Sequence, residues 1–161
     1  MIDKRRVLAL LRARLDDSLR SFAASQGEVQ AGAVHEETRQ EDPKDTRAIE
    51  ATYLARGLAE RVELLQEAIG RIARFRLVAF GPAAPIDAGA LVGLSEEDGS
   101  EAIYFIVPVA GGESLEVDGK TVKTLTPASP LGRALIGKQP DDEIELQLPG
   151  KRLLATIGWV R

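Results

Sequence analysis

The sequence contains no cysteine and one histidine, and aromatic residues make up only 4% of its 161 positions. Disulfide bonds and thiolate metal sites are therefore excluded, which fits a reducing compartment. With His35 as the lone imidazole, a catalytic triad and a histidine-based zinc site have no support. A glycine-rich phosphate loop is also missing. Carboxylates are the side chains that remain for chemistry.

Long hydrophobic runs and an excess of positive charge are missing too. No apolar run approaches the roughly 20 residues of a membrane-spanning helix, and the charged N-terminus is followed by no signal-peptide core. We therefore expect a cytoplasmic protein without a membrane partner. The net charge is -4, and the acidic excess lies entirely in the second half. Independent binding to duplex DNA is not expected, so contact with nucleic acid would run through a protein partner.

The first half of the chain has a helical pattern. Gly27 and Gly32 weaken it, because each costs roughly 1 kcal/mol relative to alanine inside a helix. We therefore expect one helix from Asp3 to about Gln26, followed by a bent or frayed stretch from Glu28 to Gln40. The first helix has apolar residues every three or four positions, which is typical of one buried face: Leu8, Leu11, Leu15, Leu19 and Phe22.

The clearest element runs from Thr46 to about Phe75. A helix of roughly 30 residues is about 45 Å long, too long for a domain of this size to cover. The two helices most simply pack on each other, which predicts an antiparallel coiled-coil hairpin over residues 1–78. The apolar residues of the second helix alternate spacings of four and three, as in a heptad repeat: Leu58, Val62, Leu65, Ile69 and Ile72.

Residues 40–46 are expected to form the turn of this hairpin. Pro43 ends the first helix, because proline cannot continue a helix and disfavours helical dihedral angles in the residue before it. Glu41, Asp42 and Asp45 give the turn three carboxylates. Acidic turns are usually just solvated. Carboxylates also bind hard cations such as Mg²⁺, but an exposed turn holds such an ion weakly unless another macromolecule supplies further ligands.

After a segment rich in proline and glycine at 81–85, the pattern changes to short alternating runs. We place a second domain at 79–161 and predict a small, mostly antiparallel β domain, so the chain belongs to the α+β class. The pair Asp118-Gly119 predicts a two-residue hairpin turn. One short helix is expected near Leu131–Ile136. Strands are expected at 90–94, 102–109, 114–117, 121–125, 143–148 and 153–160.

One motif in this second half is specific. Residues 129–138 read Ser-Pro-Leu-Gly-Arg-Ala-Leu-Ile-Gly-Lys, followed by Asp-Asp-Glu at 141–143 and Leu-Pro-Gly-Lys at 148–151. This pattern resembles the C-terminal domain of the bacterial GreA/GreB transcript cleavage factors. The resemblance extends back across the β domain and, more weakly, over the helical hairpin. It implies an N-terminal coiled coil joined to an FKBP-like β domain.

The resemblance also implies a role in transcription. In that family the β domain docks at the rim of the RNA polymerase secondary channel, and the coiled coil reaches the active centre. Acidic tip residues there help to hold the second Mg²⁺ for cleavage near the RNA 3′ end. Asp42 and Asp45 match these acids, with Glu41 as a third, and would share Mg²⁺ only in the complex. The factor itself would have no cofactor, and the polymerase would remain the enzyme.

The tip departs from the family pattern. Pro43 replaces a leucine, Asp45 is one methylene shorter than the family's glutamate, and an asparagine and a tyrosine are missing. A shift of about 1 Å at a catalytic centre can cost roughly a hundredfold in rate. Two hypotheses therefore stand side by side. One is a factor that stimulates transcript cleavage, and the other is a non-cleaving regulator that occupies the channel.

Docking on the polymerase is assigned through the resemblance to Ser129, Pro130, Leu131 and Arg133. The same residues could equally just complete the fold of their loop. A coiled-coil adaptor without a polymerase link is a further alternative, and the motif at 129–138 argues against it.

A hypothesis from another class of function is that the protein is a prolyl isomerase, since FKBP-like domains include such enzymes. Their pockets are lined by aromatic side chains. The aromatic residues after position 81 are Tyr104, Phe105 and Trp159. We expect all three in the core of the β domain, which argues against isomerase activity.

Overall fold

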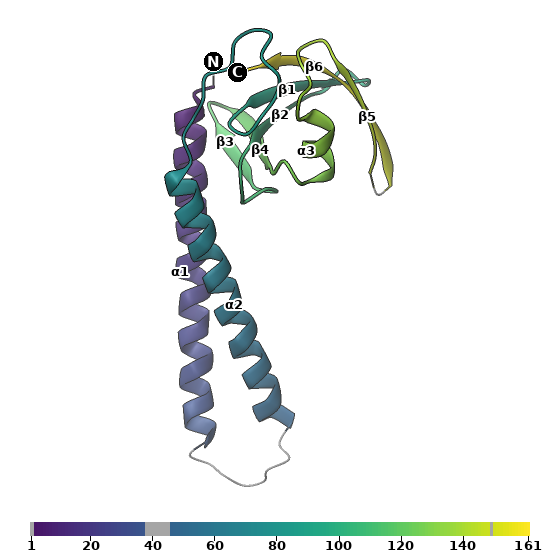
Figure 1. Cartoon of the computed structure of the whole chain (residues 1–161). Helices are drawn as coiled ribbons and strands as arrows, with labels where there is room; N and C mark the ends of the chain where they lie inside the picture. The colour runs from purple at the N-terminus through teal and green to yellow at the C-terminus, as the bar shows by residue number, and fades with distance from the viewer. Residues whose placement is uncertain (1, 38–45, 149) are drawn as a thin grey trace. The chain divides into compact units, whose positions relative to one another are not determined.

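A computed structural model of the chain describes residues 2–37, 46–148 and 150–161 (Figure 1). The chain forms two compact units. The first, called here the sheet unit, joins Met1–Leu11 to Arg71–Arg161. The second, called here the arm unit, consists of Arg12–Gly70. In the described part of the chain, no helix is both long enough and apolar enough to cross a membrane.

The two long helices predicted from the apolar spacing are confirmed. Helix α1 spans Lys4–Glu37 and helix α2 spans Thr46–Arg74. Helix α1 continues through Gly27, where the sequence predicted a bend or fraying, and Figure 1 shows it as one rod. Helix propagation is cooperative, so the roughly 1 kcal/mol cost of one glycine does not end a helix of this length.

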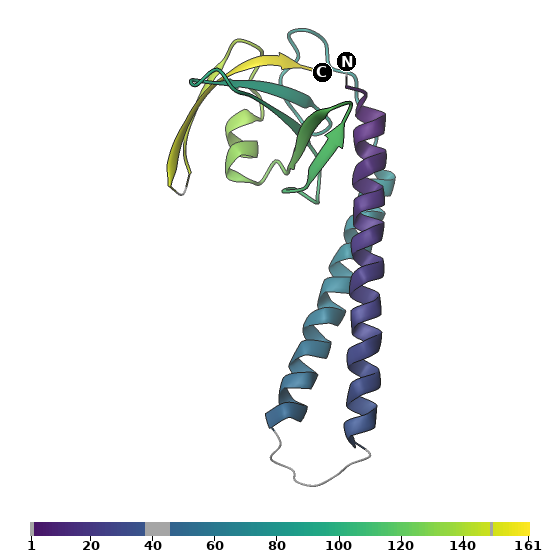
Figure 2. The same ribbon diagram turned by 180° about the vertical axis from the view of Figure 1, so that it is seen from behind.

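Within the arm unit, α1 and α2 run antiparallel and carry the predicted apolar stripes. Leu15 on α1 and Leu65 on α2 are buried, with 3% and 6% of their surface exposed. Further out, the guanidinium of Arg61 on α2 lies 5.5 Å from the ring centroid of Phe22 on α1. This cation–π contact joins the two helices. Figures 1 and 2 show their outer ends standing apart, and the stripe is half-buried there, at Leu19, Phe22, Leu58 and Val62.

Six strands form one sheet in the order β3-β4-β2-β1-β6-β5. The α+β prediction is confirmed, with one difference from an antiparallel sheet: β2 and β4 are parallel, with Ile103 opposite Val122. The reason is that β3 turns back after β2, and the β3–β4 hairpin then reverses the chain again. The strands are β1 Leu91–Glu96, β2 Glu101–Ile106, β3 Ser114–Val117, β4 Lys120–Leu125, β5 Glu143–Leu148 and β6 Lys151–Val160.

The predicted two-residue turn between β3 and β4 is confirmed. Val117 pairs with Lys120 across the hairpin. Asp118 and Gly119 both have positive φ, at 52° and 74°. Two successive positive φ values are the signature of a type I′ turn, which matches the right-handed twist of the strands. The turn therefore fixes the direction in which β4 begins.

The short helix α3, Pro130–Leu135, packs against the sheet (Figure 1). Its Leu131 and Leu135 are buried together with apolar side chains of β1, β5 and β6. This cluster is one core of the sheet unit, and it positions α3. Its fully or nearly fully buried members are Ile86, Ala90, Val92, Leu94, Ile106, Leu131, Leu135, Ile144, Leu153, Ala155, Ile157 and Val160.

The first turn of α1 is tied to the segment before β1, inside the sheet unit. The Lys4 ammonium donates to the carbonyl oxygen of Gly89 at 3.0 Å and to that of Val78 at 2.5 Å. It also lies 4.8 Å from the ring centroid of Phe80. Burial lowers the pKa of Lys4 below its usual value. These contacts compensate the partial loss of water around the ammonium.

Candidate functional site

The predicted tip acids Glu41, Asp42 and Asp45 lie outside the described residues. The structure does show the two elements that carry them, since α1 ends at Glu37 and α2 begins at Thr46. Elsewhere in the described ranges, no three His, Cys, Asp or Glu side chains gather in a way that could hold a metal ion. The assignment of Mg²⁺ to Asp42 and Asp45 stays a prediction.

The predicted docking residues lie together at the start of α3. Ser129 is the N-cap: its hydroxyl accepts a hydrogen bond from the Gly132 amide at 3.0 Å and donates to the Thr126 carbonyl oxygen at 2.8 Å. Pro130 follows in the first turn of the helix, where a missing amide hydrogen costs nothing. Ser129 and Pro130 therefore set the start and the direction of this helix.

The four predicted docking residues differ in exposure. Leu131 is 8% exposed and belongs to the core, so it supports the surface from beneath. Ser129 is half-buried, whereas Pro130 and Arg133 are exposed. Arg133 donates through Nη1 to the carbonyl oxygen of Ala128, which holds its stem along the helix start. Pro130 and Arg133, three positions apart, share one face of α3.

Sequence reasoning missed one exposed residue beside this face. Ile136 directly follows α3, continues the spacing of three, and keeps 37% of its surface exposed. The segment that carries it is rigid, because the Gly137 amide donates to Ile86 O and the Ile86 amide donates to Lys138 O, each at 2.8 Å. The exposed face is called here the candidate docking surface: Pro130, Arg133 and Ile136. The sequence did hold a sign that Ile136 is exposed, because this apolar residue lies between the end of the short helix and a glycine.

The aromatic residues of the second half separate into two groups. Phe105 is fully buried, as predicted. Tyr104 and Trp159 are only half-buried. Tyr104 packs against the core cluster, whereas the core position predicted for Trp159 is wrong. Burial raises the pKa of Tyr104, with a smaller contribution from the nearby carboxylate of Glu96. Trp159 lies on the sheet over Gly93, which pairs with it across β1 and β6.

Together these features define a two-part protein, in which a long helical hairpin is joined to a small mixed β sheet that carries one capped helix. Residues 82–160 match the family described as transcription elongation factor GreA/GreB, C-terminal. Together with two curated GreA and GreB relatives, this match supports a divergent member of the GreA/GreB family.

The relatives match over part of their length. The chain is 48% identical over 61 residues to transcription elongation factor GreA of Sphingopyxis alaskensis, which covers 38% of this chain and 35% of that protein. It is 34% identical over 103 residues to transcription elongation factor GreB of Pseudomonas aeruginosa, which covers 62% and 56%. The match therefore spans 35% and 56% of the length of these two relatives.

Solved structures resemble the chain as well. GreA factor homolog 1 (Gfh1) of Thermus thermophilus aligns with a TM-score of 0.39 at 19% identity, covering 93% of this chain and 94% of that one. GreA/GreB from Nitrosomonas europaea aligns with a TM-score of 0.38 at 24% identity, covering 63% and 92%.

Proposed function

We propose that this chain binds RNA polymerase at its secondary channel and stimulates cleavage of backtracked RNA by the polymerase. The observation that carries the proposal is the match of residues 82–160 to the GreA/GreB C-terminal domain. The helices support it: α2 has 29 residues, which at 1.5 Å per residue is roughly 44 Å, enough to reach a recessed active centre. Such a factor works in the cytoplasm, beside the polymerase.

In this proposal the β domain, residues 79–161, is the docking part. Pro130 and Ile136 offer exposed apolar surface, and the guanidinium of Arg133 has further donors after its bond to Ala128 O. Arginine is favoured at interfaces because its planar fork pairs with carboxylates through two hydrogen bonds. Ser129 and Leu131 support this surface without contacting the partner: Ser129 caps α3, and Leu131 packs in the core.

The hairpin, residues 1–78, is the part that acts at the active centre. Asp42 and Asp45, with Glu41, would complete the ligands of the second Mg²⁺ while the polymerase supplies the others. That ion would position the attacking water near the RNA 3′ end. The chain would then be an accessory factor, and the polymerase would perform the hydrolysis.

A second candidate function keeps the docking and drops the cleavage. It is favoured by the departures at the tip, where Pro43 and Asp45 replace the leucine and glutamate of the family pattern. A shorter acid can leave its carboxylate about 1 Å from the position that the ion needs, which is enough to cost roughly a hundredfold in rate. The protein would then regulate transcription by occupying the channel.

The test is RNA cleavage in stalled, backtracked complexes of the cognate polymerase at saturating Mg²⁺. The intact chain is compared with Asp42→Ala/Asp45→Ala and with a control, Glu63→Ala/Glu67→Ala, which removes two exposed acids from α2. Binding of all three is measured separately. We expect the tip variant to bind normally and to lose roughly a hundredfold in stimulated rate, and the control to keep its activity.

Other outcomes discriminate between the candidates. If all three proteins bind and none stimulates cleavage, the non-cleaving regulator is correct. Equal loss in the tip variant and the control would mean that only the charge of the arm matters. If the intact chain does not bind the polymerase, both candidate functions fail.

A further inference from the structure

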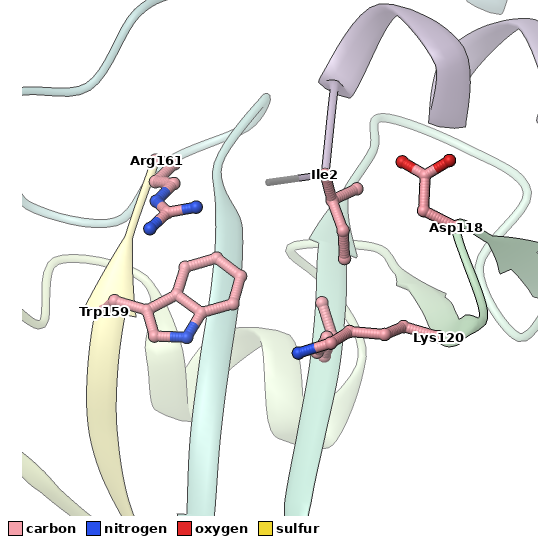
Figure 3. A pocket seen from close by; sticks show the side chains of 6 residues that line it. Ile2, Asp118, Lys120, Trp159 and Arg161 are labelled. Carbon is pink, nitrogen blue, oxygen red and sulfur yellow. The ribbon is translucent and has the colours of Figure 1, made fainter.

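The sheet unit has a second surface feature that the proposed function does not use. A hollow of about 180 Å³, called here the Trp159 hollow, opens where the residue before α1, the start of β4 and the end of β6 meet (Figure 3). Asp118 and Lys120 flank its opening on the β3–β4 turn. Its lining residues are Ile2, Ile103, Asp118, Lys120, Trp159 and Arg161.

The hollow carries an excess of positive charge. Asp118 is ion-paired with Arg6, so its negative charge is already compensated. Within the part of the chain that the structure describes, neither Lys120 nor Arg161 forms an ion pair with a carboxylate. Two cations therefore face the same small space, and an anion placed there would relieve their mutual repulsion.

Trp159 adds a third donor. A Cβ at Gly93 would lie 2.3 Å from the indole ring, so the ring lies directly on the β1 backbone there. The Arg161 guanidinium lies 4.9 Å from the ring centroid. Among the described residues Nε1 has no acceptor, and it is not enclosed. Figure 3 shows this nitrogen on the edge of the ring that faces Lys120.

The backbone that carries these donors is ordered before any ligand arrives. The type I′ turn at Asp118-Gly119 fixes the start of β4 and thus the backbone of Lys120, whose side chain is exposed. The backbone of Arg161 is paired with Leu91 in both directions, at 2.8 Å and 2.9 Å. A site whose backbone is already ordered loses less entropy on binding than one in which the backbone must also assemble.

We propose that the Trp159 hollow binds the phosphate group of a small phosphate ester. A phosphate monoester is a dianion with three terminal oxygens, which matches two cations and one neutral donor. A carboxylate has one charge and two oxygens, so it would leave one donor and one cation unmatched. Ile2 and Ile103 supply apolar surface for the carbon atoms next to the phosphate. Sites that enclose whole drug-sized ligands measure roughly 300–1,000 Å³, so this smaller hollow takes the phosphate end alone.

The single tryptophan of the sequence makes the site directly observable. Its indole N–H gives one ¹H–¹⁵N resonance in the NMR spectrum of the full chain, without polymerase. The titrants are glycerol 3-phosphate, inorganic phosphate, glycerol and acetate, at constant ionic strength. We expect a saturable shift of the indole resonance with glycerol 3-phosphate, a weaker affinity for inorganic phosphate and acetate, and no shift with glycerol.

Matched variants distinguish specific binding in the Trp159 hollow from nonspecific electrostatic attraction. Lys120→Ala and Arg161→Ala should each weaken glycerol 3-phosphate binding by about tenfold, because each removes one charge-assisted contact. Lys123→Ala removes the same charge from an exposed position on the same strand, outside the hollow, and should bind like the intact chain. The remaining resonances report whether each variant is folded.

Two results would overturn the proposal. One is a chain whose indole resonance does not shift saturably with glycerol 3-phosphate. The other is a loss in Lys123→Ala as large as that in Lys120→Ala, which would assign the effect to net charge. Because no polymerase is present, either result leaves the proposed role in transcription untouched.

Discussion

At the scale of single residues, Gly132 has little free space beside the candidate docking surface. A Cβ at this position would lie 2.0 Å from the Thr126 carbonyl oxygen and 2.9 Å from Ser129 Oγ. The Ser129 hydroxyl donates a hydrogen bond to this Thr126 oxygen, and Ser129 Oγ is also the atom that caps α3 by accepting from the Gly132 amide. The cap and the close approach of the helix to residue 126 thus both require glycine here. The Ser-Pro-Leu-Gly run of the sequence is in this sense one structural motif.

We predict that Gly132→Ala destabilises the sheet unit by about 2–3 kcal/mol, because Thr126 and the helix start must move apart. Urea unfolding followed by tryptophan fluorescence measures the change, since Trp159 lies in this unit. Wild-type stability in the variant would show that the helix start yields easily. The same variant should also bind polymerase more weakly, since Pro130 and Arg133 would be displaced.

The predicted docking residues show what one sequence can reveal about a surface. Ser129, Pro130, Leu131 and Arg133 were found through a motif, and the structure places them in one turn of chain. Their exposure could not be read from the motif, because burial of Leu131 depends on β strands that are distant in sequence. Ile136 was missed for the same reason, since its apolar type alone favoured a core position.

At the scale of elements, the alternation of polar and apolar residues predicted the positions of the strands well. The bounds of β3 and β5 agree with the predicted 114–117 and 143–148 because polar and apolar residues alternate cleanly there. Alternation carries no information on the neighbour of a strand, so the parallel pairing of β2 with β4 could not be predicted. The turn at Asp118-Gly119 was predictable because its positive φ angles demand these residue types.

Gly27 gives a prediction at the same scale. No atom lies within 4 Å of a Cβ placed there, so the residue is an unpacked glycine in the interior of α1. We predict that Gly27→Ala stabilises the helix by about 0.5–1 kcal/mol, since alanine loses less backbone entropy on folding. The midpoint of thermal unfolding, followed by circular dichroism at the helical band, should rise.

Gly57 on α2 is the matched control for that change, because it lies inside a helix and a Cβ added there would also meet open space. Gly57→Ala should raise the midpoint by a similar amount, and the double variant by nearly the sum. A lower midpoint of thermal unfolding in either single variant would contradict the prediction. It would mean that the glycine stabilises the folded arm although no atom lies close to it.

At the scale of the whole molecule, the two long helices are shared between the compact units. The apolar spacing is the same along all of α2, so it cannot indicate which turns belong with the sheet. The N-terminal end of α1 and the C-terminal end of α2 belong to the sheet unit. Val7, Leu11 and Ile72, which lie there, are completely buried. In the arm unit the corresponding stripe residues are mostly half-buried.

This difference in burial predicts a difference in local stability along one helix. Residues 7–11 of α1 lie in the sheet unit, and residues 22–31 lie in the arm unit. Local unfolding of residues 22–31 exposes little apolar surface, whereas local unfolding of residues 7–11 exposes side chains that are fully buried. Native-state hydrogen exchange should therefore be at least about tenfold slower for amides 7–11 than for amides 22–31, after correction for intrinsic rates.

The comparison within α1 keeps secondary structure constant, so a difference in exchange reports packing alone. Equal protection along the whole of α1 would mean that the helix opens only together with the sheet unit. A gradient would instead show that the arm can open locally while the candidate docking surface stays folded. In the proposed function, the outer arm could then adapt to a polymerase channel at a small cost in free energy, because the side chains that hold the docking surface are buried in the other unit.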